Sequence, residues 1–159
     1  MHFTALLAVI FVLLSVSTAI NLSPHGNPLS IQVDQDGSYT INVEGEKWLS
    51  NGLLQVLSFR EWQQPQFVGS SDTKGQDAFG VYHEHRISWK FKFDVPWETA
   101  FRVYDSQPII LFEQLYPRGM NATSTPDTSG VSATFPSFDL GSQVCPSYYF
   151  HFSFYCYED

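Results

Sequence analysis

The sequence predicts an all-β fold: an antiparallel β-sandwich preceded by a signal peptide helix. Short segments in which apolar and polar residues alternate, as they do in half-buried strands, recur about every ten residues. Clusters of Gly, Pro, Asn and Asp separate these segments, and no long span keeps an apolar face at helical spacing. Phe, Tyr and Trp, which favour strands, make up 16% of the chain. We therefore expect roughly seven to nine short strands, a number typical of an antiparallel sandwich or an open barrel.

The first strands are predicted on either side of a tight turn. Residues 29–33 and 39–43 alternate apolar and polar side chains, and Gly37 lies in the turn between them. Residues 53–59 predict a further strand with a less regular pattern, as in a strand buried on both faces. Residues 61–77 contain Pro, Gly and few apolar side chains, and they predict a long irregular loop that is either functional or poorly ordered.

The central region carries the strongest strand pattern. Ile87, Trp89, Phe91 and Phe93 alternate with polar residues, so these large apolar side chains share one face and predict core positions. We expect residues 94–97 to break this strand, because they include a proline. Further strands are predicted at residues 101–104, 109–112 and 131–135, with a loop over residues 119–130.

The two ends of the chain differ from the domain between them. Residues 1–19 combine an apolar run with small residues up to Ala19, which predicts a cleaved signal peptide and a secreted protein. An uncleaved signal anchor is the alternative, but the run is shorter than the ~20 apolar residues of a spanning helix, so we expect no membrane contact after cleavage. Residues 20–141 form the predicted β-sandwich domain. Residues 142–159 are an aromatic-rich tail of doubtful structure, which we expect to be an edge strand or not native coding sequence.

Charge and composition exclude several classes of partner. The chain has 8 Lys and Arg against 16 Asp and Glu, a net charge of −8, and the basic residues are spread singly. Nucleic-acid binding normally needs a basic patch, so we expect no nucleic-acid partner. The sequence contains no phosphate loop, dinucleotide fingerprint, nucleophile elbow or zinc-site spacing, so we expect no cofactor. The sequence leaves the oligomeric state open.

Secretion permits disulfides and N-glycosylation. Cys145 and Cys156 can pair with each other and close a short C-terminal loop. The sequon at Asn121 lies in a polar loop and predicts glycosylation there. The sequon at Asn21 lies beside the expected new N-terminus and is followed by Pro24, so we do not expect modification at that site.

The segment His83, Glu84 and His85 is the most suggestive metal-binding pattern. On a strand the two histidines share a face, as the ligands of a transition metal do. A metal site needs a third ligand, and the sequence places none beside them. We therefore expect ordinary strand or turn residues at these positions, and no metal.

Glycoside hydrolysis needs two carboxyl groups, one of them protonated. With 16 acidic residues in the chain, chance pairs are expected, and the sequence predicts no catalytic residue. The carboxyl groups that we considered for such a pair are those of Asp94, Glu98, Asp105 and Glu113.

Trp62 and Trp97 adjoin predicted loops, where an exposed indole can stack on a sugar ring. Partial burial at a strand end is the alternative and the commoner outcome for such large amphipathic rings. We name both residues as candidate glycan contacts, with carbohydrate as the candidate partner.

A series of motifs in the central region resembles a known family. The motifs are DAFGVY at 77–82, WK at 89–90, FRVYD at 101–105, IILFEQ at 109–114 and FPSF at 135–138. Over about residues 30–140 the chain resembles the N-terminal β-sandwich region of secreted clan D glycoside hydrolases of the α-galactosidase/raffinose-synthase-like kind. The resemblance implies a supersandwich-like fold. It also implies that the catalytic aspartates lie on a following (β/α)₈ barrel of ~250 residues.

We therefore expect a secreted, non-catalytic β-sandwich domain, truncated or alternatively spliced from a glycoside-hydrolase-like protein. The alternative is a carbohydrate-binding, lectin-like module that uses Trp62 and Trp97. A third hypothesis, a lipocalin-like carrier, requires strands closed around a cavity, and the irregular strand spacing disfavours it.

Overall fold

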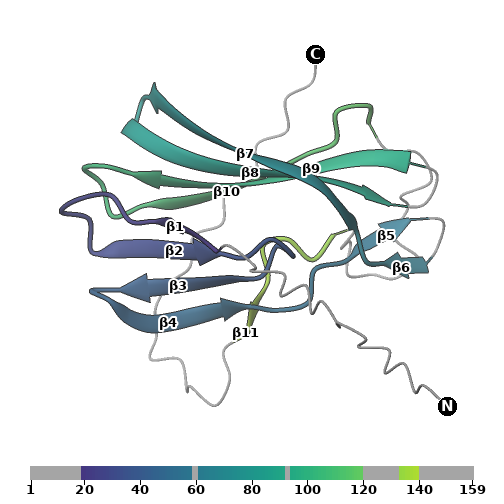
Figure 1. Cartoon of the computed structure of the whole chain (residues 1–159), viewed down its shortest axis with the longest axis horizontal. Helices are drawn as coiled ribbons and strands as arrows, with labels where there is room; N and C mark the ends of the chain where they lie inside the picture. The colour runs from purple at the N-terminus through teal and green to yellow at the C-terminus, as the bar shows by residue number, and fades with distance from the viewer. Residues whose placement is uncertain (1–18, 59–60, 92–93, 120–132, 140–159) are drawn as a thin grey trace, which may run out of the picture.

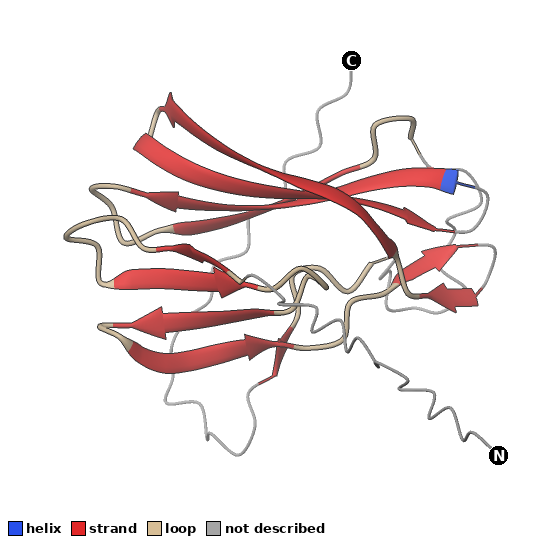
Figure 2. Cartoon of the chain, viewed as in Figure 1, coloured by secondary structure: helices blue, strands red, loops and turns tan. Residues whose placement is uncertain are grey.

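A computed structural model of the chain describes residues 19–58, 61–91, 94–119 and 133–139. In this part the chain is all-β and every strand pairing is antiparallel, which confirms the predicted all-β class and its antiparallel pairing. Strands and loops account for nearly all of the described chain (Figure 2). The strands are β1 (Ile20–Leu22), β2 (Leu29–Val33), β3 (Tyr39–Val43), β4 (Glu46–Asn51), β5 (Val56–Ser58), β6 (Glu61–Gln63), β7 (Gln66–Asp77), β8 (Gly80–Phe91), β9 (Val95–Tyr104), β10 (Ile110–Leu115) and β11 (Phe138–Asp139).

The strands form two layers with a small hairpin at one end (Figure 1). The first layer is a five-stranded sheet in the order β1-β2-β3-β4-β11, and the second is a four-stranded sheet in the order β10-β9-β8-β7. Strands β5 and β6 pair with each other and lie beside the two layers. Within the described part, no helix is long and apolar enough to cross a membrane.

The core lies between the two layers and follows from strand alternation. Ile31, Val33 and Ile41 point inward from the first sheet, while Ile87 and Trp89 point inward from the second, and all five are buried. Burying one large apolar side chain stabilises a fold by about 1.5–3 kcal/mol. Ile87, Trp89 and Phe91 on β8 are buried as predicted, while Phe93, the fourth residue of the predicted core face, lies outside the described residues.

One end of the core is aromatic. The rings of neighbouring residues meet edge-on or tilted, with centroids 5.2 to 6.4 Å apart, which is the favoured geometry for such pairs. The cluster joins strands from both sheets and so ties the layers together. Its members are Tyr39, Phe101, Phe112, Phe135 and Phe138.

The prediction of a long loop over residues 61–77 is wrong. The segment contains β6 and the twelve-residue strand β7. Strand β7 pairs with β8 along its length, and nearly all its side chains are exposed. Backbone hydrogen bonds rather than apolar burial hold this strand. Its sequence therefore shows no alternation of apolar and polar residues from which the strand could be predicted. Gly75 has a further role, since a Cβ there would lie 2.5 Å from the Tyr82 ring that covers it.

Two other boundaries also differ from the predictions. Strand β9 starts at Val95 and includes Pro96. Proline has no N–H to donate, but β10 ends opposite Glu98, so no residue of β10 needs a hydrogen bond from position 96. Of the strand predicted at residues 131–135, the first two residues lie outside the described part. Ala133 forms a single bridge to Val56, and the last strand within the described residues is β11.

Gly37 in the β2–β3 turn allows a direct test of packing. Its φ is +82°, and a Cβ there would lie 2.6 Å from the Trp89 ring. We expect Gly37→Ala to lower the free energy of unfolding by about 2–4 kcal/mol, from backbone strain and overpacking together. Gly45 has a φ of +85° with nothing near its Cβ position, so Gly45→Ala should cost only about 1–2 kcal/mol. Urea unfolding of both variants measures the difference, and equal losses would contradict the packing argument.

Candidate functional site

The prediction of Trp97 as a glycan contact is wrong. Its side chain is 0% exposed, so no sugar can reach it. The ring stacks on Tyr116 with centroids 6.2 Å apart and meets Phe135 edge-on at 6.4 Å. The physical reason is the start of β9 at Val95, which makes Trp97 an inward-facing strand residue rather than a loop residue.

Trp62 differs, because it lies on the small β5–β6 hairpin and is 44% exposed. Its role as a glycan contact stays a prediction. Asn121, Cys145 and Cys156 lie outside the described residues, as does the predicted signal peptide apart from Ala19.

His83 and His85, the two histidines considered as metal ligands, each pair with a carboxylate. His85 is buried, and its Nδ1 lies 2.7 Å from Asp72 Oδ1 on β7. His83 Nε2 lies 3.0 Å from Asp105 Oδ1, in the turn after β9. The part of the chain that the structure describes contains no group of three side chains able to hold a metal ion. The two pairs join β8 to β7 and to the turn after β9.

The main polar cluster lies on the outer face of the four-stranded sheet, the face turned away from the five-stranded sheet. Glu84 is its centre, and this side chain is only 7% exposed although it points away from the core. Arg102 Nη2 donates to Glu84 Oε2 at 2.7 Å, and Arg86 Nε donates to Glu84 Oε1 at 3.1 Å. Two guanidinium groups therefore enclose one carboxylate.

Arg86 extends this cluster to strands β9 and β10. Its Nη1 donates to Glu98 Oε2 at 3.2 Å, and its Nη2 donates to Glu113 Oε2 at 2.6 Å. Glu98 and Glu113 were both considered as catalytic carboxyls, and the structure brings them together on one guanidinium. The other two candidates lie elsewhere: Asp94 pairs with Lys90 at 3.2 Å, and Asp105 pairs with His83.

Arg102 extends the cluster in the opposite direction, to the end of β7. Its Nη1 donates to Asp77 Oδ2 at 3.3 Å, and its guanidinium lies 4.1 Å from the centre of the Tyr82 ring. The Tyr104 hydroxyl donates to the same Asp77 oxygen at 2.7 Å. We call the full set the outer-face network: Asp77, Glu84, Arg86, Glu98, Arg102 and Glu113.

The pKa shifts in the outer-face network follow from these bonds. The Tyr104 hydroxyl, and then the Phe79 amide and Arg102, hold the pKa of Asp77 below its usual value against the opposing effect of burial. Burial opposes the charge on Arg102, but its hydrogen bonds to Glu84 outweigh this and raise the pKa of the guanidinium. Both shifts favour the charged forms, which is the opposite of what a proton donor near neutral pH needs.

The lowered pKa of Asp77 predicts a pH dependence. A carboxyl with a depressed folded pKa stabilises the fold above its unfolded pKa of about 3.9, and this stabilisation is lost as pH falls through the folded value. We expect Asp77→Asn to unfold more easily than the parent protein at pH 7, with the difference shrinking below about pH 4. Urea unfolding at several pH values measures it. A difference that stays constant down to the acid limit would contradict the assigned shift.

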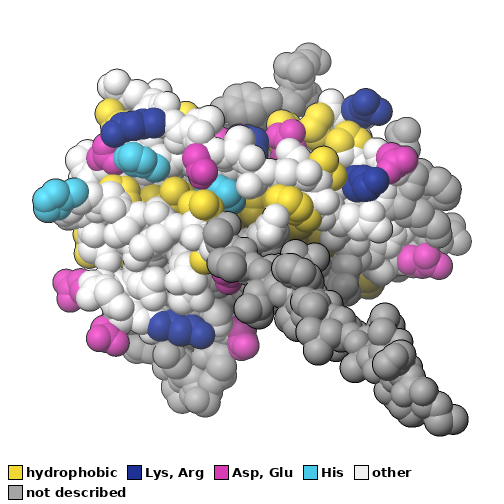
Figure 3. All heavy atoms as spheres, in the orientation of Figure 1, with side chains coloured by type: hydrophobic (Ala, Val, Ile, Leu, Met, Phe, Trp, Pro, Cys, Tyr) yellow, Lys and Arg dark blue, Asp and Glu magenta, His cyan; other side chains and the backbone are white. Residues whose placement is uncertain are grey.

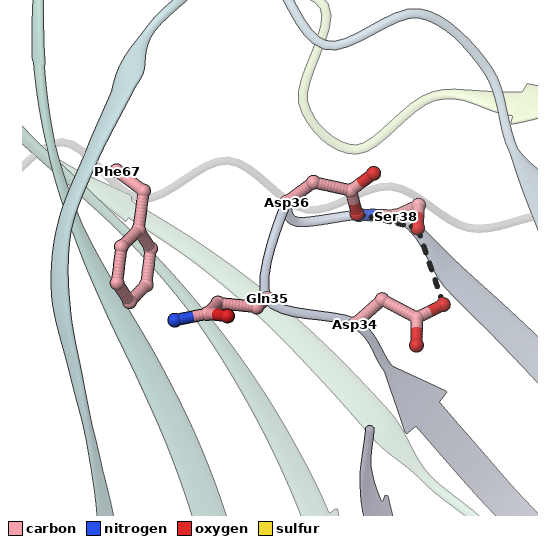
Figure 4. A pocket seen from close by; sticks show the side chains of 5 residues that line it. All are labelled: Asp34, Gln35, Asp36, Ser38 and Phe67. Carbon is pink, nitrogen blue, oxygen red and sulfur yellow. Dashed lines mark hydrogen bonds between the residues drawn. The ribbon is translucent and has the colours of Figure 1, made fainter. Parts of the chain in front are cut away.

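A pocket of about 380 Å³ opens beside the β2–β3 turn (Figure 4). The amide of Gln35 and the ring of Phe67 point toward each other across it. Phe67 is 37% exposed and is held edge-on against Trp89, with ring centroids 6.0 Å apart. A shift of register in β7 directly after Phe67 sets the direction of this side chain. We call this site the turn pocket; its lining residues are Asp34, Gln35, Asp36, Ser38 and Phe67.

Ser38 fixes the carboxylates of the turn pocket. Its hydroxyl donates to Asp36 Oδ1 at 2.6 Å and to Asp34 Oδ2 at 3.3 Å, and its amide donates to Asp36 Oδ1 at 2.9 Å. These hydrogen bonds lower the pKa of Asp36, so the group is ionised in neutral solution. The pocket thus offers hydrogen-bond acceptors on one side and an aromatic ring on the other, which is suited to a ligand rich in hydroxyl groups.

Sequence reasoning missed both the turn pocket and the centre of the outer-face network. The alternation of Glu84 and Arg86 with buried residues on β8 was the available signal, since it places both on the solvent side of a strand. Pairing them with Arg102 and Glu113 needs the strand register, which the sequence does not supply. On the face that Figure 3 shows, basic side chains lie singly among acidic ones. Comparison of the chain with protein families, with curated proteins and with solved structures finds no match.

Proposed function

We propose that this chain is a secreted, non-catalytic β-sandwich domain of the accessory kind that precedes the barrel of clan D glycoside hydrolases. The motif series between residues 77 and 138 supports the proposal, because the resemblance covers about residues 30–140 and the two antiparallel layers occupy most of the same segment. The apolar run in residues 1–19 supports secretion. A supersandwich-like arrangement of the layers is part of the proposal.

One observation carries the non-catalytic part of the proposal. The carboxylates that converge on one face, Glu84, Glu98 and Glu113, all accept hydrogen bonds from Arg86. Glycoside hydrolysis needs one carboxylic acid that keeps its proton near neutral pH, through burial or a neighbouring negative charge. Bonds from a guanidinium stabilise the ionised form instead. The arrangement is therefore structural, and it joins strands β8, β9 and β10.

An activity assay tests this proposal. The purified protein, with its fold verified by circular dichroism, is incubated with a panel of nitrophenyl α- and β-glycosides. We expect no turnover above that of a buffer control. Turnover that co-purifies with the folded protein and is lost in Glu98→Gln or Glu113→Gln would overturn the proposal. Glu46→Gln is the matched control, since Glu46 is an exposed residue at the start of β4.

The turn pocket favours a second candidate function, carbohydrate binding. Phe67 supplies an exposed ring, and the fixed carboxylates of Asp34 and Asp36 supply acceptors for sugar hydroxyls. On this proposal Phe67 takes the role that the sequence assigned to Trp97.

A glycan array followed by calorimetric titration tests the second candidate. We expect Phe67→Ala to abolish the binding of any glycan that the parent protein retains. Trp62→Ala is the informative comparison, because Trp62 is also exposed but is not part of the turn pocket. A silent array, or binding that Phe67→Ala leaves unchanged, would remove the turn pocket as a sugar site.

A further inference from the structure

Strand β7 is a long sheet edge. Among the described strands, it pairs with β8 alone and stands at the end of the four-stranded sheet. It is twelve residues long, and its side chains are exposed on both faces of the sheet over most of that length. In Figure 1 it crosses the front of the molecule, and no other labelled strand lies along its outer side. Such an edge presents a row of backbone donors and acceptors to another strand.

The register identifies which residues of β7 present these groups. The Val81 carbonyl accepts from the Asp105 amide, so residue 81 points its backbone groups toward β9. Gln76 faces Val81 across the β7–β8 ladder, so these two residues form a non-bonded pair. Bonded and non-bonded pairs alternate along an antiparallel ladder. Gln76, Lys74 and Asp72 therefore point their N–H and C=O groups outward, while Thr73 bonds to β8.

The charges on this edge are complementary to themselves. Asp72 and Lys74 flank Thr73, and both side chains are 59% exposed. If two copies of β7 pair antiparallel about a two-fold axis at Thr73, then Asp72 of each copy faces Lys74 of the other. An axis at Asp72 would place two aspartates opposite each other, and an axis at Lys74 would place two lysines opposite each other. Opposed like charges destabilise a strand pair and opposite charges stabilise it, so the charges favour the axis at Thr73 over these two.

We propose that β7 is a dimerisation edge, where a second copy of this chain pairs antiparallel about a two-fold axis at Thr73. The two four-stranded sheets then form one continuous sheet across both copies. Asp72 and Lys74 supply the outward backbone bonds of the central bonded pairs, and their side chains form two cross-strand ion pairs on the same face. This inference does not depend on the proposed function.

Charge exchange tests the proposal by sedimentation velocity. We expect the parent protein to reach the mass of two chains as its concentration rises. Asp72→Lys and Lys74→Asp should each remain monomeric, because each opposes like charges. The double variant D72K/K74D should dimerise again, since every cross-strand pair is then reversed.

Recovery in the double variant distinguishes the proposed dimer from a loss of folding. Asp72 also contacts His85, and Lys74 lies 3.5 Å from Asp105 within one chain. Exchanging the two charges restores neither contact, so recovery of the dimer comes only from pairing between copies. A parent protein that stays monomeric at every concentration, or a dimer insensitive to these charges, would overturn the proposal.

A cysteine at the axis gives an independent test. In a non-bonded antiparallel pair the Cα atoms lie about 4.5 Å apart, which suits a disulfide. Thr73→Cys, in a background with Cys145 and Cys156 replaced by Ser, should form a covalent dimer on oxidation. Ser71→Cys is the control, because the two copies of residue 71 would lie ~13 Å apart along the strands. Equal cross-linking of both variants would contradict the register.

Discussion

Replacing Trp97 by Ala is expected to lower the free energy of unfolding by about 3–5 kcal/mol. The indole is fully buried, and it contacts Tyr116, Phe135 and Trp89, so its removal leaves a cavity between the two layers. Urea unfolding followed by circular dichroism measures the loss. Trp62→Ala is the matched control, because Trp62 is 44% exposed and its removal should cost less than about 1 kcal/mol.

Trp97→Phe separates packing from hydrogen bonding at the same position. The Nε1 of Trp97 is buried and has no hydrogen-bond partner in the described part of the chain. Phenylalanine removes this unpaired donor and keeps most of the apolar contact, so the loss should be less than half that of the alanine variant. If the Phe and Ala variants lose equal stability, packing around the indole is not the dominant effect.

The strands that could be predicted are those whose stability comes from apolar burial. Ile87, Trp89 and Phe91 alternate strictly, and the structure buries all of them on one face of β8. Strand β7 could not be predicted in this way, because its partner is the backbone of β8 and its own side chains stay in water. The start of β9 could not be predicted either, because Pro96 indicates a strand break unless the neighbouring strand is known to end before it.

The candidate site was less predictable than the fold, because its residues meet only through the strand register. Arg86 and Glu113 are 27 positions apart, yet Nη2 and Oε2 lie 2.6 Å apart. The sequence identified Glu98 and Glu113 as candidates for a carboxyl pair, and it gave no reason to place a guanidinium between them. That guanidinium changes the chemistry, since it favours ionised carboxylates over a shared proton. Phe67 was missed because its segment looked like a loop.

Glu84→Gln is expected to lower the free energy of unfolding by about 2–3 kcal/mol. The side chain is 7% exposed, and its charge compensates two partly buried guanidiniums, Arg86 and Arg102. The amide keeps the shape of the carboxylate but leaves both cations without this counter-charge. Glu46→Gln is the control at an exposed position and should change stability by less than about 0.5 kcal/mol. Equal effects of the two substitutions would contradict a central role for Glu84.

A double-mutant cycle between Glu84 and Arg102 measures their interaction directly. We expect a coupling energy of about 1–3 kcal/mol from Glu84→Gln, Arg102→Gln and the double variant. Because Glu84 is nearly closed to solvent, the coupling should persist in high salt, where exposed ion pairs are screened. The outer-face network joins β7 at Asp77, β8 at Glu84, β9 at Arg102 and β10 at Glu113, so a large coupling means that it holds the four strands as one unit. A coupling near zero would instead make each ion pair a local contact.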